Sequence, residues 1–197
     1  MFVAGTDTTS HTAMMMIYLC LMFPDVLEKL KAEIAEHIKT PEDLTYETIK
    51  KMKYLDCVFC EATRYYQPAN GIFFREATRD FLLKDIPVKK GTLFITSSMV
   101  NHYYSGNYEK PLEFKPERWM TEEGKAWVPK PYTALTFSAG PRSCIGKQLA
   151  QLEMKLMAVI IFMNYDLKME TTDLVMKLEN FSYQPQTMNV RFKKLIE

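Results

Sequence analysis

The stretch that most constrains this chain is FSAGPRSCIG, residues 137–146, which lies directly before a long apolar segment. Two glycines, Gly140 and Gly146, flank the single cysteine Cys144, and Arg142 stands two residues before it. Glycine adopts backbone conformations that other residues avoid, and it lets a flat ligand approach without meeting a Cβ. We therefore expect an open loop at these residues, followed by a helix that begins near Gly146.

This loop is a candidate metal-ligand site. A helix N-terminus and a nearby cation both lower the pKa of a cysteine from its usual value of about 8.5, and so favour the thiolate. Arg142 adds a planar cation suited to carboxylates. The pattern predicts that Cys144 is a metal-bound thiolate beneath a cofactor with acidic side groups. The alternative is an ordinary loop cysteine in a glycine turn.

Composition limits the other possibilities. The chain has 197 residues, of which 47% are hydrophobic and 25% are charged, as in ordinary globular proteins. A net charge of +1 gives no indication of a nucleic-acid partner. Four irregularly spaced cysteines are too few for a secreted disulfide framework, which favours a reducing compartment. Cys57 and Cys60 form one CxxC without a second pair for zinc, so they and Cys20 are expected in the core.

Apolar spacing predicts a mainly α protein with small β-sheets. The expected helices span residues 2–23, 24–38, part of 40–52, 54–66 and 146–165. Short strands are expected between 72 and 100, irregular chain over 101–137, and a hairpin near the end. The apolar run 13–23 is too short to span a bilayer and indicates a buried helix. One face of the last helix is expected to carry Ile145, Leu149, Leu152, Leu156, Val159, Ile160 and Met163.

Two further motifs contain acid–base pairs. EATR places Glu61 and Arg64 three residues apart on one helical turn, where they can meet; such pairs are common on surfaces and contribute little there. FKPERW adds Glu117 and Arg118 within proline-rich coil, a pattern that suggests a residue holding a loop in place.

The motif AGTDTT, residues 4–9, is a poor choice for helix propensity alone. Gly5 permits a local break in the helical hydrogen-bond ladder. Asp7 and Thr8 could then act as a proton-delivery pair. The alternative is that threonine and aspartate cap a helix N-terminus. The motif by itself does not separate these interpretations.

In the order AGTDTT, EATR, FKPERW and FSAGPRSCIG, the four motifs resemble the C-terminal portion of a cytochrome P450, a haem-thiolate monooxygenase. The resemblance covers residues 1–197, from the middle of the family's long distal helix to its terminal hairpin. It implies the cytochrome P450 fold, with this chain as the haem-ligating part of one domain. The opening MFVAG, which lacks capping or turn chemistry, agrees with the expectation of a truncated chain.

Residue by residue, the resemblance implies that Cys144 is the proximal ligand to the iron of haem b, and that its thiolate favours O–O cleavage. Asp7 and Thr8 match the acid–alcohol pair that delivers protons in dioxygen activation. Segments 67–73 and 184–188 match substrate-pocket positions. The matched cofactor contacts are Phe137, Arg142, Arg75, Gly140, Gly146, Ala4 and Gly5, and the matched network behind the cysteine is Glu61, Arg64 and Arg118.

The resemblance also implies a reaction. It is insertion of one oxygen atom from dioxygen into an apolar substrate, with electrons from an NADPH-dependent reductase. The full-length parent would lie on the cytosolic face of the endoplasmic reticulum membrane. A haem-thiolate isomerase or dehydratase is an alternative, although the intact Asp7 and Thr8 argue against it; a truncated, non-catalytic product is another. We expect the isolated chain to hold haem weakly and to be inactive. His102, in a loose version of the family's His-Arg-Asp stretch, receives no role.

Overall fold

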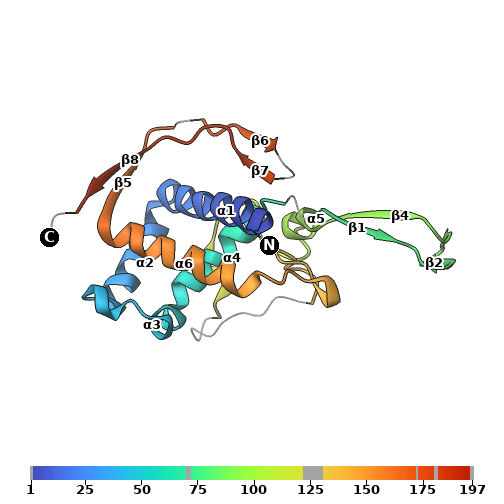
Figure 1. The fold of residues 1–197 in the computed structure, drawn as a ribbon, viewed down its shortest axis with the longest axis horizontal. Coiled ribbons are helices and arrows are strands. Elements are labelled where there is room, and N and C mark those ends of the chain that lie inside the picture. The colour runs from blue at the N-terminus through green and yellow to red at the C-terminus, as the bar shows by residue number, and fades with distance from the viewer. Residues whose placement is uncertain (1, 70–71, 122–130, 172, 180–181, 196–197) are drawn as a thin grey trace.

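The computed structural model describes residues 2–69, 72–121, 131–171, 173–179 and 182–195. Four long helices form the body of the molecule (Figure 1). They are α1 (Phe2–Met22), α2 (Pro24–His37), α4 (Lys53–Tyr65) and α6 (Lys147–Asn164), with short helices α3 (Tyr46–Lys51) and α5 (Ser98–Tyr103) and 3-10 turns η1 (Pro41–Asp43), η2 (Pro116–Trp119) and η3 (Gly140–Arg142). The prediction of a mainly α protein with small sheets is confirmed.

Local chemistry explains where these helices begin. Pro24 opens α2 at a first-turn position, where a missing N–H costs nothing. Thr45 caps α3, since its hydroxyl accepts the Thr48 N–H at 3.2 Å. The N-cap residue of α4, Met52, makes no capping hydrogen bond with its side chain. Instead the Glu33 carboxylate of α2 accepts the N–H groups of Tyr54 and Leu55 at 2.7 and 2.8 Å. The start of α4 is therefore held by a carboxylate from another helix.

The core lies where α1 packs against α2, α4 and α6. None of the helices in the described ranges combines the length and apolar character needed to span a bilayer. Of the residues expected on one apolar face of the last helix, Ile145 precedes α6 and is 87% exposed, and Leu149 is 56% exposed, so that face is not uniformly buried. Apolar residues surround most of this helix, so their spacing does not single out one face. The side chains of α6 that are buried are Met154, Ala158, Val159 and Phe162.

The strands of the described residues pair into four two-stranded antiparallel sheets. They are β1 (Ile72–Glu76) with β4 (Leu93–Ser97), β2 (Phe81–Leu83) with β3 (Ile86–Val88), β5 (Tyr165–Met169) with β8 (Val190–Lys194), and β6 (Met176–Glu179) with β7 (Ser182–Pro185). The strand expected to reach Val100 ends at Ser97. The chain turns into α5 there because Ser98 is buried and its hydroxyl contacts the Gln67 side chain at 2.6 Å.

The sheets lie outside the helical body. The β1–β4 ribbon extends away from it, whereas the last strands arch over α1 (Figure 1). At the end of that arch the Tyr183 N–H donates to the Pro68 carbonyl at 2.6 Å, and the Tyr183 and Tyr66 rings stack at 6.4 Å. The terminal hairpin is thereby joined to the segment that follows α4. Irregular chain follows α5 as predicted, although residues 122–130 of it lie outside the described ranges.

Candidate functional site

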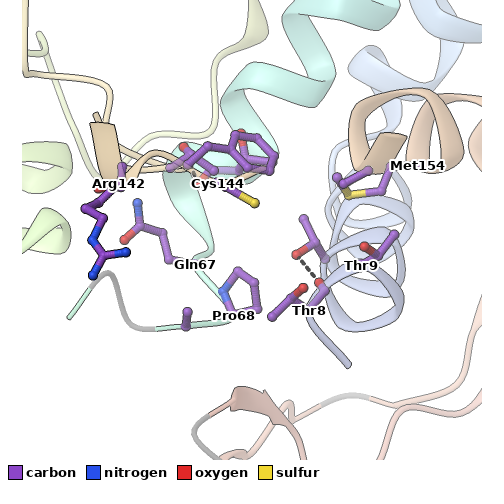
Figure 2. A pocket seen from close by; sticks show the side chains of 14 residues that line it. Thr8, Thr9, Gln67, Pro68, Arg142, Cys144 and Met154 are labelled. Atoms are coloured by element: carbon purple, nitrogen blue, oxygen red, sulfur yellow. Dashed lines mark hydrogen bonds between the residues drawn. The ribbon is translucent and has the colours of Figure 1, made fainter. Parts of the chain in front are cut away.

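A cavity of about 240 Å³ opens between α1, the chain after α4 and the loop before α6 (Figure 2). Threonines of α1 face it from one side, and the cysteine loop (residues 135–146) faces it from another. Hydroxyl groups and apolar side chains make up most of the lining. The lining residues are Thr8, Thr9, Thr12, Thr63, Gln67, Pro68, Ala69, Thr136, Phe137, Ser138, Arg142, Cys144, Ala150 and Met154.

Backbone hydrogen bonds give the cysteine loop its shape. The Cys144 N–H donates to the Phe137 carbonyl at 2.9 Å, and the Ser143 N–H donates to the Gly140 carbonyl at 3.0 Å. Gly140 has a φ of +73°, a left-handed conformation that favours glycine, as predicted. Ser138 also has a positive φ, 60°, without being a glycine, so the sequence does not reveal this turn.

Gly146 departs from the prediction. Its φ is −84°, which any residue can adopt, and a Cβ there would lie 3.9 Å from the Cys144 sulfur, an ordinary contact distance. The special backbone expected at both glycines is therefore needed only at Gly140. Helix α6 begins at Lys147, so the exposed Cys144 stands just ahead of it, as expected.

Phe137 and Arg142 share the cavity with Cys144. The Phe137 ring stacks on the Phe59 ring of α4, with 6.4 Å between centroids and 18° between planes. The Lys147 ammonium lies 6.0 Å from the centroid of the Phe137 ring. This packing anchors the first turn of the loop to the core. The loop thus brings a thiol, a guanidinium and an aromatic ring to one cavity.

On the opposite element, α1 is continuous through Gly5, so the predicted break is not observed. The capping alternative is also wrong, because Asp7 and Thr8 lie inside the helix. Thr8 lines the cavity, and its hydroxyl donates to the Ala4 carbonyl at 2.6 Å. Asp7 is half-buried and is not among the lining residues, and neither are Ala4 and Gly5. Thr9, which the motif analysis left without a role, does face the cavity.

Arg75 lies elsewhere. It is exposed on β1, donates to the Phe74 carbonyl at 2.7 Å, and lines a separate cavity with Arg79 and Phe94. Of the segment expected to line the pocket, Gln67, Pro68 and Ala69 do so, while residues 70–71 lie outside the described ranges; segment 184–188 is not part of the lining. The cavity therefore gathers part of the predicted set.

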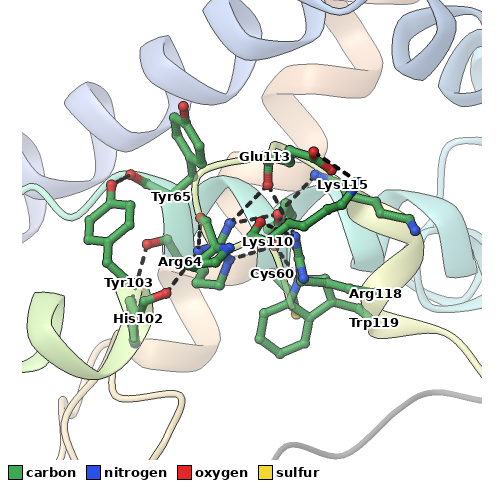
Figure 3. Close-up of polar contacts among 12 residues, drawn as sticks. Cys60, Arg64, Tyr65, His102, Tyr103, Lys110, Glu113, Lys115, Arg118 and Trp119 are labelled. Atoms are coloured by element: carbon green, nitrogen blue, oxygen red, sulfur yellow. Dashed lines mark hydrogen bonds and ion pairs between the residues drawn. The ribbon is translucent and has the colours of Figure 1, made fainter. Parts of the chain in front are cut away.

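A buried ion network joins α4 to η2 and to the irregular chain before it (Figure 3). Arg64 donates to both oxygens of Glu61, from Nε and Nη2, at 2.8 Å each. Arg118 Nε adds a bond of 2.9 Å to Oε1, and Trp119 Nε1 adds one of 2.8 Å to Oε2. Glu61 and Arg64 are 0% and 1% exposed. The structure thus brings together the predicted residues Glu61, Arg64 and Arg118, and it adds Trp119.

The arginines of this network also fasten the irregular chain after α5. Arg64 Nη1 donates to the carbonyls of His102 and Pro111 at 2.9 and 2.8 Å. Arg118 Nη1 donates to the Glu109 carbonyl at 2.7 Å. A coil without periodicity is ordered here because side-chain donors satisfy its carbonyl groups. Tryptophan next to Arg118 in FKPERW was the one sequence indication of the extra member.

The remaining cysteines are packing residues, as predicted. Burial raises the pKa of Cys20 and of Cys57 to about 12, and that of Cys60 to about 11, so these thiols stay neutral. Within the described ranges, three or more His, Cys, Asp or Glu side chains nowhere gather as they would around a metal ion. A metal at the cavity would need other donors besides Cys144.

Comparison with known proteins gives a consistent result. The sequence profile of the family described as Cytochrome P450 matches residues 1–192. Cytochrome P450 3A16 of Mus musculus is 35% identical over 182 residues, which are 92% of this chain and 32% of that protein. Cytochrome P450 monooxygenase traB of Penicillium crustosum is 34% identical over 170 residues, 85% of this chain and 33% of that protein.

A solved structure shares the fold. The crystal structure of cytochrome P450DA heme domain superimposes with a TM-score of 0.86 at 24% identity, over 96% of this chain and 42% of that chain. At this identity the likeness concerns the fold alone. The chain spans about a third of the length of the curated relatives it matches.

Proposed function

The chain belongs to the cytochrome P450 family, and from that premise we propose that it is the C-terminal, haem-ligating part of a monooxygenase. The observation that carries this proposal is a single exposed thiol, Cys144, which shares a cavity with Thr8 of α1. The proposed reaction inserts one oxygen atom from dioxygen into an apolar organic substrate.

The residues present fit a haem. Thiolate-ligated haem, for which cytochromes P450 are the known case, requires one protein sulfur and no cluster of further ligands. Gly140 supplies the left-handed turn of the cysteine loop, and Arg142 offers a guanidinium to the acidic side groups of a porphyrin. Phe137, stacked on Phe59, would give the loop a fixed aromatic surface next to the sulfur.

When bound, the group supplies dioxygen activation, which an electron-rich thiolate ligand promotes. The chain's own contribution is to hold protons and exclude water. Thr8 keeps a hydroxyl at the cavity, with its proton directed to the Ala4 carbonyl at 2.6 Å, so its oxygen can accept a hydrogen bond from the cavity side. Asp7, the residue before Thr8 on α1, is the proposed source of replacement protons.

Substrate and partners follow at the level of chemical class. Apolar residues, among them Pro68, Ala69 and Met154, make up part of the lining, which suits a hydrophobic small molecule. We propose an NADPH-dependent reductase as electron donor, and for the full-length parent a place at the cytosolic face of the endoplasmic reticulum membrane.

The test uses the complete reading frame that contains this chain, expressed with haem. We expect the reduced, carbon-monoxide-bound protein to give a thiolate-type absorption band that Cys144→Ala abolishes. The matched control is Cys60→Ala, a half-buried core thiol that should leave the band intact. A histidine-type band in the unmodified protein, or a band that survives Cys144→Ala, would overturn the assignment.

A further inference from the structure

His102, to which the sequence analysis gave no role, is fully buried at the end of α5. Its ring contacts three separate parts of the chain. Nε2 accepts the backbone N–H of Leu135 at 2.9 Å. Nδ1 lies 3.2 Å from the Arg64 carbonyl oxygen and 2.7 Å from the Gln67 side-chain amide. No other imidazole in the described ranges is as deeply enclosed.

These contacts select one form of the ring. A backbone N–H can only donate, so Nε2 must be unprotonated and the proton of the neutral imidazole must be on Nδ1. From there it points to the Arg64 carbonyl. The Gln67 amide presents its nitrogen to Nδ1 at 2.7 Å, and its oxygen accepts the Ser98 hydroxyl at 2.6 Å. The two ends of an amide have nearly the same shape, and exchanging them lets the oxygen accept the Nδ1 proton while the nitrogen donates to the Ser98 hydroxyl.

A second proton on the ring would be unfavourable. It would place an Nε2–H against the Leu135 N–H, and it would add a charge beside the Arg64 guanidinium. The groups that face the ring are Arg64 and Glu61 of α4, Gln67 after α4, and the Tyr108 ring at 6.4 Å. Burial, the largest influence, lowers the pKa of His102 to about 4. The ring is neutral at physiological pH.

The His102 ring contacts two segments that form part of the cavity wall, the start of the cysteine loop and Gln67. Leu135 begins the cysteine loop, and its carbonyl accepts the Ser138 N–H at 3.0 Å. The next residue, Thr136, lines the cavity, and its hydroxyl donates to the Thr63 carbonyl of α4 at 3.3 Å. Gln67 lines the same cavity. One buried ring therefore holds the first residue of the loop and a second part of the cavity lining.

The same residue is tied to the ion network in both directions. Arg64 Nη1 donates to the His102 carbonyl at 2.9 Å, while the His102 ring faces the Arg64 carbonyl at 3.2 Å. His102 thus joins the network, through two hydrogen bonds with Arg64, to the cysteine loop, through the one hydrogen bond from the Leu135 N–H.

We propose that His102 is a positioning residue: its neutral ring transmits the fixed geometry of the ion network to the cysteine loop and to Gln67. The proposal rests on the proposed function where it concerns haem, because only there does the placement of Cys144 matter for chemistry. The contact between the ring and the loop is made by protein atoms alone, so it can be tested without haem.

The test compares three variants in the complete reading frame. His102→Leu fills similar space without an acceptor, and His102→Gln offers an amide oxygen near the Nε2 position. Ile34→Ala, in the core between α2 and its neighbours, is the control for a general loss of stability. Hydrogen exchange of residues 135–144 is measured without haem, and the lifetime of the thiolate-type band is measured with haem and carbon monoxide.

We expect His102→Leu to speed exchange in this segment by about tenfold relative to Ile34→Ala, since the Leu135 N–H loses its buried acceptor, and to shorten the band lifetime by about as much. His102→Gln should recover most of both. Equal exchange in His102→Leu and Ile34→Ala, or no recovery with His102→Gln, overturns the proposal. If exchange responds as expected but the unmodified protein shows no thiolate-type band, the positioning of the loop stands and the haem function fails.

Discussion

The ion network and the cysteine loop are neighbours with opposite character. In the network, Glu61 is 0% exposed and each of its oxygens accepts two or more hydrogen bonds. In the loop, Cys144 is exposed and Ile145 is 87% exposed. The loop is ordered by a few backbone hydrogen bonds of its own and by the hydrogen bond from the Leu135 N–H to His102. The difference indicates that contacts from neighbouring elements fix the backbone of the loop, while the Cys144 sulfur stays exposed, which suits its proposed role as a haem ligand.

The comparison predicts that the network mainly contributes to stability and that the cysteine loop mainly contributes to cofactor chemistry. Substitutions in the network should change the free energy of unfolding by large amounts. Substitutions at the sulfur should change cofactor chemistry and leave the free energy of unfolding almost unchanged. Residues that connect the two regions should fall between. Four substitutions or conditions test this order, from the largest expected effect on unfolding to the smallest.

The largest effect is expected for Glu61→Gln. It leaves two buried guanidinium groups, Arg64 and Arg118, without their shared carboxylate, and breaking a buried ion pair in this way costs about 3–5 kcal/mol. Urea unfolding of the haem-free protein measures the shift in midpoint. Glu47→Gln, whose carboxylate is 71% exposed and 4.0 Å from Lys50, is the control and should not shift the midpoint measurably. Equal midpoints for the two variants would remove the contrast.

The second effect depends on pH and concerns His102. Its pKa is about 4 in the folded protein, because of burial, and about 6.5 when unfolded. Between these values the unfolded chain binds a proton that the folded chain does not. The contribution of the neutral His102 to the free energy of unfolding is therefore fully present above pH 6.5 and is lost as the pH falls towards 4. It amounts to roughly 3 kcal/mol.

The measurement is the change in unfolding free energy between pH 7 and pH 4.5, compared in the unmodified protein and in His102→Gln. Other groups titrate in both proteins, so the difference between the two slopes isolates the histidine. We expect the variant to lose less stability on acidification. Parallel slopes would mean that the ring is not buried in the neutral form.

A smaller loss is expected for Trp119→Phe. Phenylalanine keeps most of the apolar contact but removes the indole N–H that donates to Glu61 Oε2 at 2.8 Å. A hydrogen bond to a charged group contributes about 1.5–3 kcal/mol, and Arg64 Nε still satisfies the same oxygen. Thermal or urea unfolding should place this variant between Glu61→Gln and the unmodified protein. A loss equal to that of Glu61→Gln would show that the indole is essential to the network.

Much of the helical frame was predictable. The spacing of apolar residues located every long helix, since a buried stripe repeats every three or four residues. It failed for the buried face of α6, where apolar residues surround the helix. It also failed at Ser98, where a strand-like run turns into α5 because a buried side-chain contact with Gln67 favours the bend. Such long-range contacts leave no local pattern in the sequence.

The site divides in the same way. Glu61 and Arg64 are adjacent on one helix, so their meeting follows from spacing, whereas their burial depends on a coil some fifty residues away that supplies Arg118 and Trp119. Gly140 could be recognised because its backbone needs glycine, but Ser138 adopts a positive φ without one. The positioning role of His102 could not be predicted, because two of its ring's partners are backbone groups and the third, the Gln67 amide, lies 35 residues away in the sequence.

The smallest effect on unfolding is expected at the residue that matters most for the proposed chemistry. Cys144→Ala keeps the backbone N–H that donates to the Phe137 carbonyl, and it removes only an exposed sulfur. In the haem-free protein the unfolding free energy should change by less than about 0.5 kcal/mol. With haem present the unmodified protein should gain stability from binding, because a ligand that prefers the folded state stabilises it, and the variant should gain less. Unfolding of both proteins with and without haem separates these quantities. A loss of several kcal/mol in the haem-free variant would mean that the sulfur is packed into the fold like the network behind it, and the contrast between the two regions would not hold.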